Sequence, residues 1–189
     1  SESELAKLKW KNISSGNCVI PFGVNSSVFL PIEFATVSGS SDVVFSTYHS
    51  AQNNLPFPQN ITNIKVDGKE LSDASAIDRW FCIKASNIKA NIKLAYEANE
   101  NTTAGIAGEE LTVISNGGGA SWRNLSTQGS LVTNGVGTVS VTKASDFSNC
   151  VIILKKDFTE SIFNLSAAYE NENVKGEWAY SVEKTGDVF

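Results

Sequence analysis

Two short apolar runs near the start of the chain, each interrupted by a proline, constrain the fold most strongly. The first is Cys18-Val19-Ile20-Pro21-Phe22, and the second is Val28-Phe29-Leu30-Pro31-Ile32-Glu33-Phe34. Residues 23–27 between them are small and turn-forming. Because proline has no N–H to donate to a central ladder, such runs are typical of edge strands. The pattern therefore predicts edge strands of an all-β module.

Strand patterns separated by turn residues continue along the chain. The clearest is residues 91–96, where apolar residues at positions 92, 94 and 96 alternate with Asn91, Lys93 and Ala95. This period of two predicts a strand with one buried face and one solvent face. Residues typical of hairpin turns recur at Asp67-Gly68 and at Asn134-Gly135. Short strands with such turns predict an antiparallel β-sandwich.

The first domain is expected to close near Leu154. The last apolar strand pattern of this region, Cys150–Leu154, is followed by the charged residues Lys155-Lys156-Asp157. A charged break after the apolar pattern is typical of a domain boundary. We therefore expect a β-sandwich module over residues 1–157 and a second unit over residues 158–189.

Charge and hydropathy exclude two classes of partner. The chain has 15 Lys and Arg residues against 20 Asp and Glu residues, a net charge of −5, and the basic residues are scattered. Nucleic-acid binding needs clustered Lys and Arg, so no nucleic-acid partner is expected. No apolar run approaches the roughly 20 residues that span a bilayer, so no membrane insertion is expected.

The three cysteines, Cys18, Cys82 and Cys150, have no CxxC spacing. This pattern indicates neither a disulfide framework nor a zinc site. Two states remain open. The thiols are either buried and unpaired, which is the commonest state of a free cysteine, or two of them form a single disulfide.

No group of residues has the pattern of an active site. His49 is the only histidine, so any Ser-His-Asp or Cys-His arrangement depends on it. Carboxylate pairs that offer acid–base chemistry or calcium ligands stand outside any glycosidase or EF-hand context. These pairs are Glu109 with Glu110, Asp73 with Asp78, and Glu170 with Glu172. The sequence predicts no enzyme, catalytic residue, cofactor or dedicated metal site, and leaves calcium at loop carboxylates open.

Two further motifs have alternative interpretations. Asn116–Gly119 is glycine-rich but lacks the Lys-Ser/Thr and helix of a phosphate-binding loop, so it predicts a hairpin turn. The four tryptophans each lie in a strand pattern, which favours core packing over a stacking platform for sugars. They are Trp10, Trp80, Trp122 and Trp178.

The order of several segments resembles a module that recurs in large cell-surface proteins of Bacteroidota. The module has an FPVG segment, a YRP strand, an RYW strand, an alternating strand that ends in Tyr, a Trp strand and a closing FS strand. The matching segments here span roughly residues 8–154: they are Cys18–Phe34, Asp78–Ile83, Ala90–Tyr96, Ser121-Trp122 and Thr142–Ile152, which includes Asp146-Phe147-Ser148. Phe22 and Leu30 depart from the usual Val and Arg. The resemblance implies cargo of the type IX secretion system, located outside the cell or on its surface.

The C-terminal tail is similar to the opening of the fibronectin-like domain that often follows this module. Residues 163–169 and 174–181 have strand patterns, the second containing Trp178. The resemblance implies two opening strands of a second Ig/fibronectin-like sandwich. Two strands alone are marginal in water, and an unpaired apolar edge invites strand addition. We therefore expect these strands to contact other protein subunits or neighbouring domains.

These features together favour a non-catalytic structural or adhesive module of a longer secreted or surface-displayed protein, adhesin-like or filamentous. The alternative is a carbohydrate-binding module of a secreted hydrolase, with surface polysaccharide as its partner. Aromatic side chains exposed in a row on one sheet face would favour the alternative. Buried tryptophans would favour the structural function.

Overall fold

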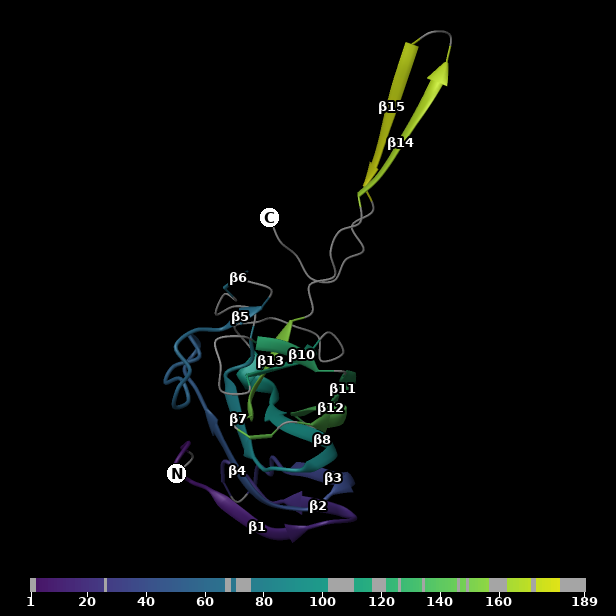
Figure 1. Ribbon diagram of the computed structural model, residues 1–189. Helices are drawn as coiled ribbons and strands as arrows, with labels where there is room; N and C mark the ends of the chain where they lie inside the picture. The colour runs from purple at the N-terminus through teal and green to yellow at the C-terminus, as the bar shows by residue number, and fades with distance from the viewer. Residues whose placement is uncertain are drawn as a thin grey trace. The chain divides into compact units, whose positions relative to one another are not determined.

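The structure is a computed structural model of the chain (Figure 1). It describes residues 3–25, 27–66, 69–70, 76–101, 111–116, 122–125, 127–133, 135–145, 147–148, 150–156, 163–170 and 173–180. The chain divides into two units, Ser1–Lys156 and Asp157–Phe189. The first unit is an antiparallel β-sandwich, which confirms the predicted fold class.

One layer of the sandwich is a six-stranded sheet of order β1-β4-β7-β13-β9-β10, with all pairs antiparallel. Its strands β7 and β13 lie in the middle, and β1 and β10 form the two edges. The strand bounds are β1 Leu8–Ile13, β4 Ser41–His49, β7 Arg79–Lys84, β9 Leu111–Asn116, β10 Trp122–Leu125 and β13 Cys150–Lys156.

The other layer is a five-stranded sheet of order β11-β12-β8-β3-β2, also antiparallel. The strand predicted from the alternation at residues 91–96 is the central strand of this sheet. The bounds are β2 Asn17–Ile20, β3 Ile32–Gly39, β8 Ile88–Glu97, β11 Thr127–Thr133 and β12 Val136–Ser145. A 3-10 helix, η2 (Ala98–Asn101), follows β8 directly.

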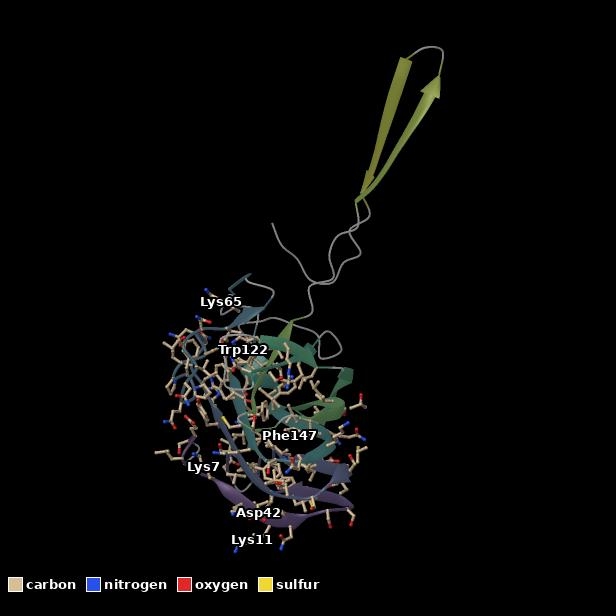
Figure 2. The ribbon with its side chains drawn as sticks, viewed as in Figure 1. Lys7, Lys11, Asp42, Lys65, Trp122 and Phe147 are labelled. Carbon is tan, nitrogen blue, oxygen red and sulfur yellow. The ribbon has the colours of Figure 1, made fainter. Side chains whose placement is uncertain are left out.

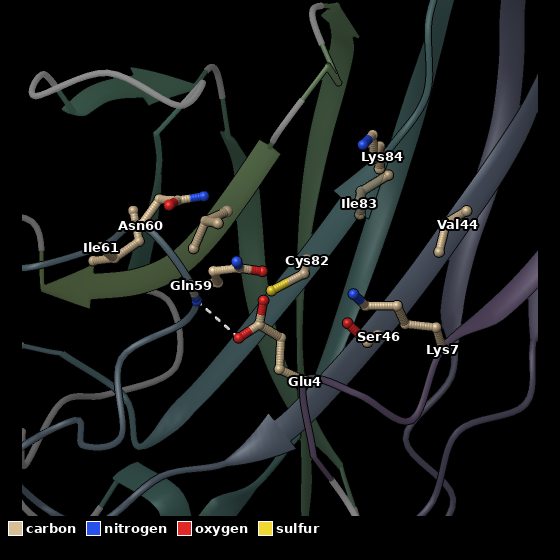
Figure 3. Close-up of a pocket in the computed structure, with 11 residues that line it drawn as sticks. Glu4, Lys7, Val44, Ser46, Gln59, Asn60, Ile61, Cys82, Ile83 and Lys84 are labelled. Carbon is tan, nitrogen blue, oxygen red and sulfur yellow. Dashed lines mark hydrogen bonds between the residues drawn. The ribbon is translucent and has the colours of Figure 1, made fainter.

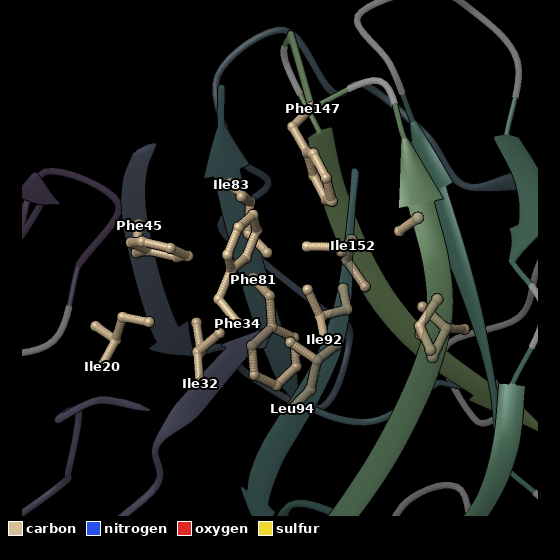
Figure 4. Packing of buried hydrophobic residues seen from close by; sticks show 14 of the residues in the cluster. Ile20, Ile32, Phe34, Phe45, Phe81, Ile83, Ile92, Leu94, Phe147 and Ile152 are labelled. Carbon is tan, nitrogen blue, oxygen red and sulfur yellow. The ribbon is translucent and has the colours of Figure 1, made fainter. Parts of the chain in front are cut away.

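The main core fills the space between the two sheets (Figure 4). Phe34 from the five-stranded sheet is central, because its ring lies 5.5 Å from those of both Phe45 and Phe147. Alternate residues of strands such as β4, β7, β8 and β13 supply the remaining core side chains, as the pleat of a half-buried strand requires. In β8, for example, Ile92, Leu94 and Tyr96 are all buried in this cluster. Burial of this apolar surface is the main force that holds the two sheets together.

The two proline-broken runs were both expected to form edge strands, and this prediction is wrong for the second run. β2 is an edge strand, but β3 lies between β2 and β8. The reason is that β3 begins at Ile32, directly after Pro31, so the proline stands outside the ladder. Pro21 likewise follows the last residue of β2. The prolines end and begin the strands here and do not interrupt them.

Hairpins connect neighbouring strands at the expected turns. β11 and β12 pair up to Thr133 and Val136, and Gly135 between them has φ +78°. A positive φ in a two-residue hairpin loop favours glycine. β5 (Lys65–Val66) and β6 (Lys69–Glu70) pair on either side of the predicted turn Asp67-Gly68, which lies outside the described residues.

The described residues of the second unit form a hairpin of β14 (Phe163–Glu170) and β15 (Asn173–Tyr180). Directly opposed residues of an antiparallel pair share one face of the ribbon. One face of this hairpin therefore combines the pairs Phe163–Tyr180, Leu165–Trp178, Ala167–Gly176 and Tyr169–Val174. The other face combines Asn164–Ala179, Ser166–Glu177, Ala168–Lys175 and Glu170–Asn173. The register thus separates an apolar face from a largely polar one.

Candidate functional site

The outer face of the six-stranded sheet carries a second apolar cluster, which is separate from the main core. Strand side chains of this face are covered by residues of the connection between β4 and β7. We call residues 50–64, the first part of this connection, the strap. The cluster consists of Tyr48, Ile61, Ile64, Ala76, Trp80, Ile114, Trp122, Val151 and Ile153, with Phe57 and Cys82 packed against it.

Trp80 and Trp122 form the centre of this second cluster. Trp80 is fully buried, and Trp122 is 5% exposed. Their ring centroids lie 6.1 Å apart at an interplanar angle of 40°. The indole N–H of Trp80 donates to the backbone O of Asn54 at 2.8 Å, and that of Trp122 donates to the backbone O of Asn63 at 3.0 Å. Both rings are therefore structural, and the strap prevents them from stacking on a sugar.

Further contacts fix the strap on the sheet. Phe57 meets Trp80 edge-on, with ring centroids 5.9 Å apart at 84°. The hydroxyl of Tyr48 donates to the backbone O of Pro56 at 2.9 Å, and burial raises the pKa of this phenol. The side-chain amide of Asn54 donates to the backbone O of Ile77 at 3.2 Å. These bonds leave the strap tied to β4, to β7 and to the residues just before β7.

A polar cluster occupies the end of the sandwich interior beside η2. Arg79 and Glu100 are buried, with 0% and 1% exposure. The guanidinium of Arg79 donates from Nε to both carboxylate oxygens of Glu100, at 3.0 and 2.8 Å, and from Nη2 to Oε1 at 2.7 Å. Nη1 of Arg79 donates to Oγ1 of Thr47 at 3.1 Å. A forked, desolvated ion pair of this kind fixes η2 against the sheet.

His49 borders this cluster. Its Nδ1 lies 3.2 Å from Oε1 of Glu100, and its side chain is 57% exposed. The carboxylate beside His49, that of Glu100, is thus already bound in the salt bridge with Arg79. Asp78 is buried and lies 3.5 Å from the side-chain amide of Asn54. The geometry supports a structural role for each of these groups.

The remaining candidates from the sequence are placed as follows. Asp73, Glu109, Glu110, Glu172 and Gly117–Gly119 lie outside the described residues. Asn116 is buried at the end of β9 and pairs with Trp122, the first residue of β10. The turn predicted between them lies outside the described residues. Glu170 and Trp178 have backbone positions in the C-terminal hairpin. Trp10 is 40% exposed on edge strand β1.

Cys18 and Cys82 are free thiols, which is one of the two states left open by the sequence, and both are partly buried. Only three cysteines are present, so no pair remains for a disulfide within the chain. Burial raises the pKa of Cys82 to about 12. The thiol is therefore protonated at neutral pH and is a poor nucleophile.

A cavity of about 350 Å³ lies on the same outer face, beside the tryptophan cluster (Figure 3). The N-terminal segment supplies Glu4 and Lys7, and the end of the strap supplies Gln59, Asn60 and Ile61. The sheet supplies the other lining residues, which are Val44, Ser46, Cys82, Ile83, Lys84 and Val151. Figure 2 shows Lys7 toward the same end of the sandwich as Asp42, away from Trp122.

Sequence reasoning missed the strap, the cavity and the partner of Arg79. One feature of the sequence does indicate a buried arginine. Arg79 alternates with Phe81 and Ile83, so all three residues lie on the same side of β7. A residue on the apolar side of a strand faces the core, so this arginine needs a buried counter-charge. Nothing local indicates that Glu100 supplies it.

Comparison with protein-family models, with curated proteins and with solved structures gave no match. Among the described residues, no group of three or more His, Cys, Asp or Glu side chains could hold a metal ion. No helix in the described part of the chain is long and apolar enough to cross a membrane.

Proposed function

We propose that this chain is a non-catalytic structural or adhesive module of a longer protein that is secreted or displayed on the cell surface. The observation that carries the proposal is the burial of Trp80 and Trp122 beneath the strap, with both indole N–H groups bonded to strap carbonyls. The aromatic surface that a sugar-binding site needs is used here for stability.

The outer face of the five-stranded sheet supports the same function. Glu33 of β3 and Lys93 of β8 form a partly buried ion pair on this face at 2.8 Å. Neighbouring outward positions carry Asn91, Thr138 and Ser140, which are small or polar. A polar, ion-paired face of this kind suits a domain that spaces or presents other parts of a protein in water.

The C-terminal hairpin supports a role in assembly. Its register places four aromatic residues on one face, namely Phe163, Tyr169, Trp178 and Tyr180. A two-stranded ribbon with an apolar face is marginal in water and gains stability when another layer covers that face. The hairpin is the proposed contact with a neighbouring domain or subunit, as the opening strands of an Ig/fibronectin-like sandwich.

The extracellular setting rests on the resemblance to Bacteroidota surface modules, which implies export by the type IX secretion system. Protease treatment of intact cells tests this location. A surface-displayed protein is cleaved without cell lysis. A protein that is cleaved only after lysis contradicts the proposed setting.

Binding assays separate the structural function from its alternative. Affinity electrophoresis of the folded chain through gels that contain neutral or acidic polysaccharides should show no retardation. Retardation that is lost in Trp80→Phe, in a variant that still melts cooperatively, would overturn the proposal.

One observation favours the alternative, a carbohydrate-binding module. Among the side chains that the structure describes, two aromatic ones are exposed, Trp10 at 40% and Phe29 at 54%. Retardation by one polysaccharide that is lost in Trp10→Ala would support the alternative and would place the binding site at β1. The proposed function predicts that Trp10→Ala and the unmodified chain migrate alike.

A further inference from the structure

The cavity on the outer face exists because small side chains form part of its floor. Ser46, Cys82 and Val151 lie in one row across β4, β7 and β13, since Cys82 is opposite both other residues. The next row of the sheet has Tyr48 opposite Trp80, and the strap covers it fully. Where large side chains give way to small ones, space remains beneath the end of the strap.

Aliphatic side chains form part of the lining of this cavity. Val44, Ile61 and Val151 contribute apolar side chains, and of these Ile61 and Val151 are otherwise buried. The side chain of Ile83 belongs to the main core on the opposite face of β7. At about 350 Å³, the cavity lies at the lower end of the roughly 300–1,000 Å³ typical of ligand pockets. Its lining residues in the described part of the chain include no aromatic ring, so the surface suits an aliphatic group better than the face of a sugar.

The charged lining is unbalanced. It contains two cations, Lys7 and Lys84, and one anion, Glu4. Neither lysine has an ion-pair partner among the described residues, whereas Lys9 is paired with Asp42 at 2.7 Å. Oε2 of Glu4 accepts the backbone N–H of Gln59 at 2.8 Å, which ties the N-terminal segment to the strap (Figure 3).

We propose that this cavity is a binding site for a small amphipathic carboxylate, with the aliphatic body on Val44, Ile61 and Val151 and the carboxylate between Lys7 and Lys84. An apolar floor with a few convergent polar groups is the common composition of a ligand pocket. Two cations against one anion favour a negatively charged head group. Binding is non-covalent, and the site is independent of the hairpin and of the proposed structural function.

The first test is titration of the full chain with octanoate, followed by two-dimensional NMR. The backbone amides of Ser46, Gln59 and Lys84 should shift in a saturable manner. Two matched probes separate the contributions of the alkyl chain and of the carboxylate. Octylamine has an alkyl chain of the same length with the opposite charge, and acetate has the carboxylate without the long chain. Neither should saturate at concentrations where octanoate does. Equal effects of octanoate and octylamine would overturn the carboxylate assignment, and shifts confined to other surfaces would overturn the site.

Charge variants of exposed or partly exposed lining residues provide the second test. Lys84→Gln should weaken octanoate binding roughly threefold to fivefold, which is typical for one partly solvated charge contact. Glu4→Gln keeps an acceptor for the Gln59 N–H and removes the opposing charge, so it should strengthen binding by a similar factor. Lys9→Gln is the matched control, because Lys9 lies in edge strand β1, two residues from Lys7, but does not line the cavity. Equal affinities of Lys84→Gln, Glu4→Gln and the unmodified chain would overturn the proposal.

A variant that fills the cavity completes the test. Cys82→Leu places a larger apolar side chain on the floor and should abolish the saturable shifts while the sandwich remains folded. Folding is checked by a cooperative thermal transition. Octanoate binding that persists in folded Cys82→Leu contradicts the site. If Cys82→Leu does not fold, the opposite effects expected for Lys84→Gln and Glu4→Gln still decide the proposal.

Discussion

The indole N–H of Trp80 donates a hydrogen bond to the backbone O of Asn54 across 2.8 Å, which joins the middle of a sheet to the strap that covers it. Asn54 has a φ of +58°, and its side-chain amide also donates to the backbone O of Ile77. One strap residue thus holds both the indole and the residues before β7. This relationship makes the outer face of the six-stranded sheet a second core.

Truncation of Trp80 should destabilise the sandwich strongly. Trp80→Ala removes a fully buried ring and is expected to cost about 3–5 kcal/mol in the free energy of unfolding. Trp80→Phe keeps an aromatic ring but leaves the Asn54 carbonyl without its indole donor, which costs about 1–3 kcal/mol. Urea denaturation measures both values. If both variants were as stable as the unmodified chain, the claim that Trp80 belongs to a second stabilising core would be contradicted.

Separation of the buried ion pair should also be costly. Glu100→Gln removes the carboxylate charge that binds the buried guanidinium of Arg79, and removal of one partner from such a pair typically costs about 3–5 kcal/mol. The double replacement Arg79→Met with Glu100→Leu removes both charges and should recover much of the loss. Urea denaturation of the single and double variants forms the test. A double variant less stable than Glu100→Gln alone would contradict this account.

Cys82 should respond to pH as a buried thiol. Burial raises its pKa from 9.0 to about 12, so the folded state favours the neutral form. The stability that this group contributes is intact below pH 9 and is lost as the pH rises toward 12. At pH 8, the folded chain therefore holds much less Cys82 thiolate than the unfolded chain.

Iodoacetamide alkylation, mapped by mass spectrometry, checks this prediction. Modification of Cys82 at pH 8 should be far slower in the folded chain than in urea, and it should accelerate steeply between pH 9 and 12. Cys18, on β2 of the other sheet, is the internal comparison. Alkylation of Cys82 at the same rate in the folded chain and in urea would show that the thiol is not buried and that its pKa is not raised.

The apolar face of the C-terminal hairpin should drive association. Leu165→Ser with Trp178→Ser alters two opposed positions on that face and should shift the chain toward monomer in light scattering. Ser166→Asn with Glu177→Gln changes the opposite face and is the matched control. Hydrogen exchange on a verified monomer gives an independent check. Strong protection of residues 173–180 in that monomer would show that the hairpin needs no partner.

Local patterns predicted much of the sandwich. Alternation at Ile92, Leu94 and Tyr96 placed β8 correctly, because a strand with one buried face has a period of two. The expectation that Trp80 and Trp122 are structural agrees with their burial. These features depend on short stretches of chain, where the pleat and the turn residues determine which side of a strand is buried.

The strap and the polar cluster could not be predicted in the same way. Residues 52–59 are a polar, proline-bearing loop, and nothing local shows that Phe57 packs on Trp80. The partner of Arg79 lies 21 residues away, in a short 3-10 helix. Such contacts depend on tertiary structure, and the cavity likewise depends on small residues from three separate strands.

The central claim is that Trp80 and Trp122 are buried by packing within the module and are therefore not available to a ligand. Hydroxyl-radical footprinting of the native chain tests this claim most directly. Mass spectrometry then gives the oxidation rate of each tryptophan. We predict rapid oxidation of Trp10 and strong protection of Trp80 and Trp122, which are 0% and 5% exposed. Oxidation of Trp80 and Trp122 as rapid as that of Trp10, in a chain that remains folded, would contradict the account.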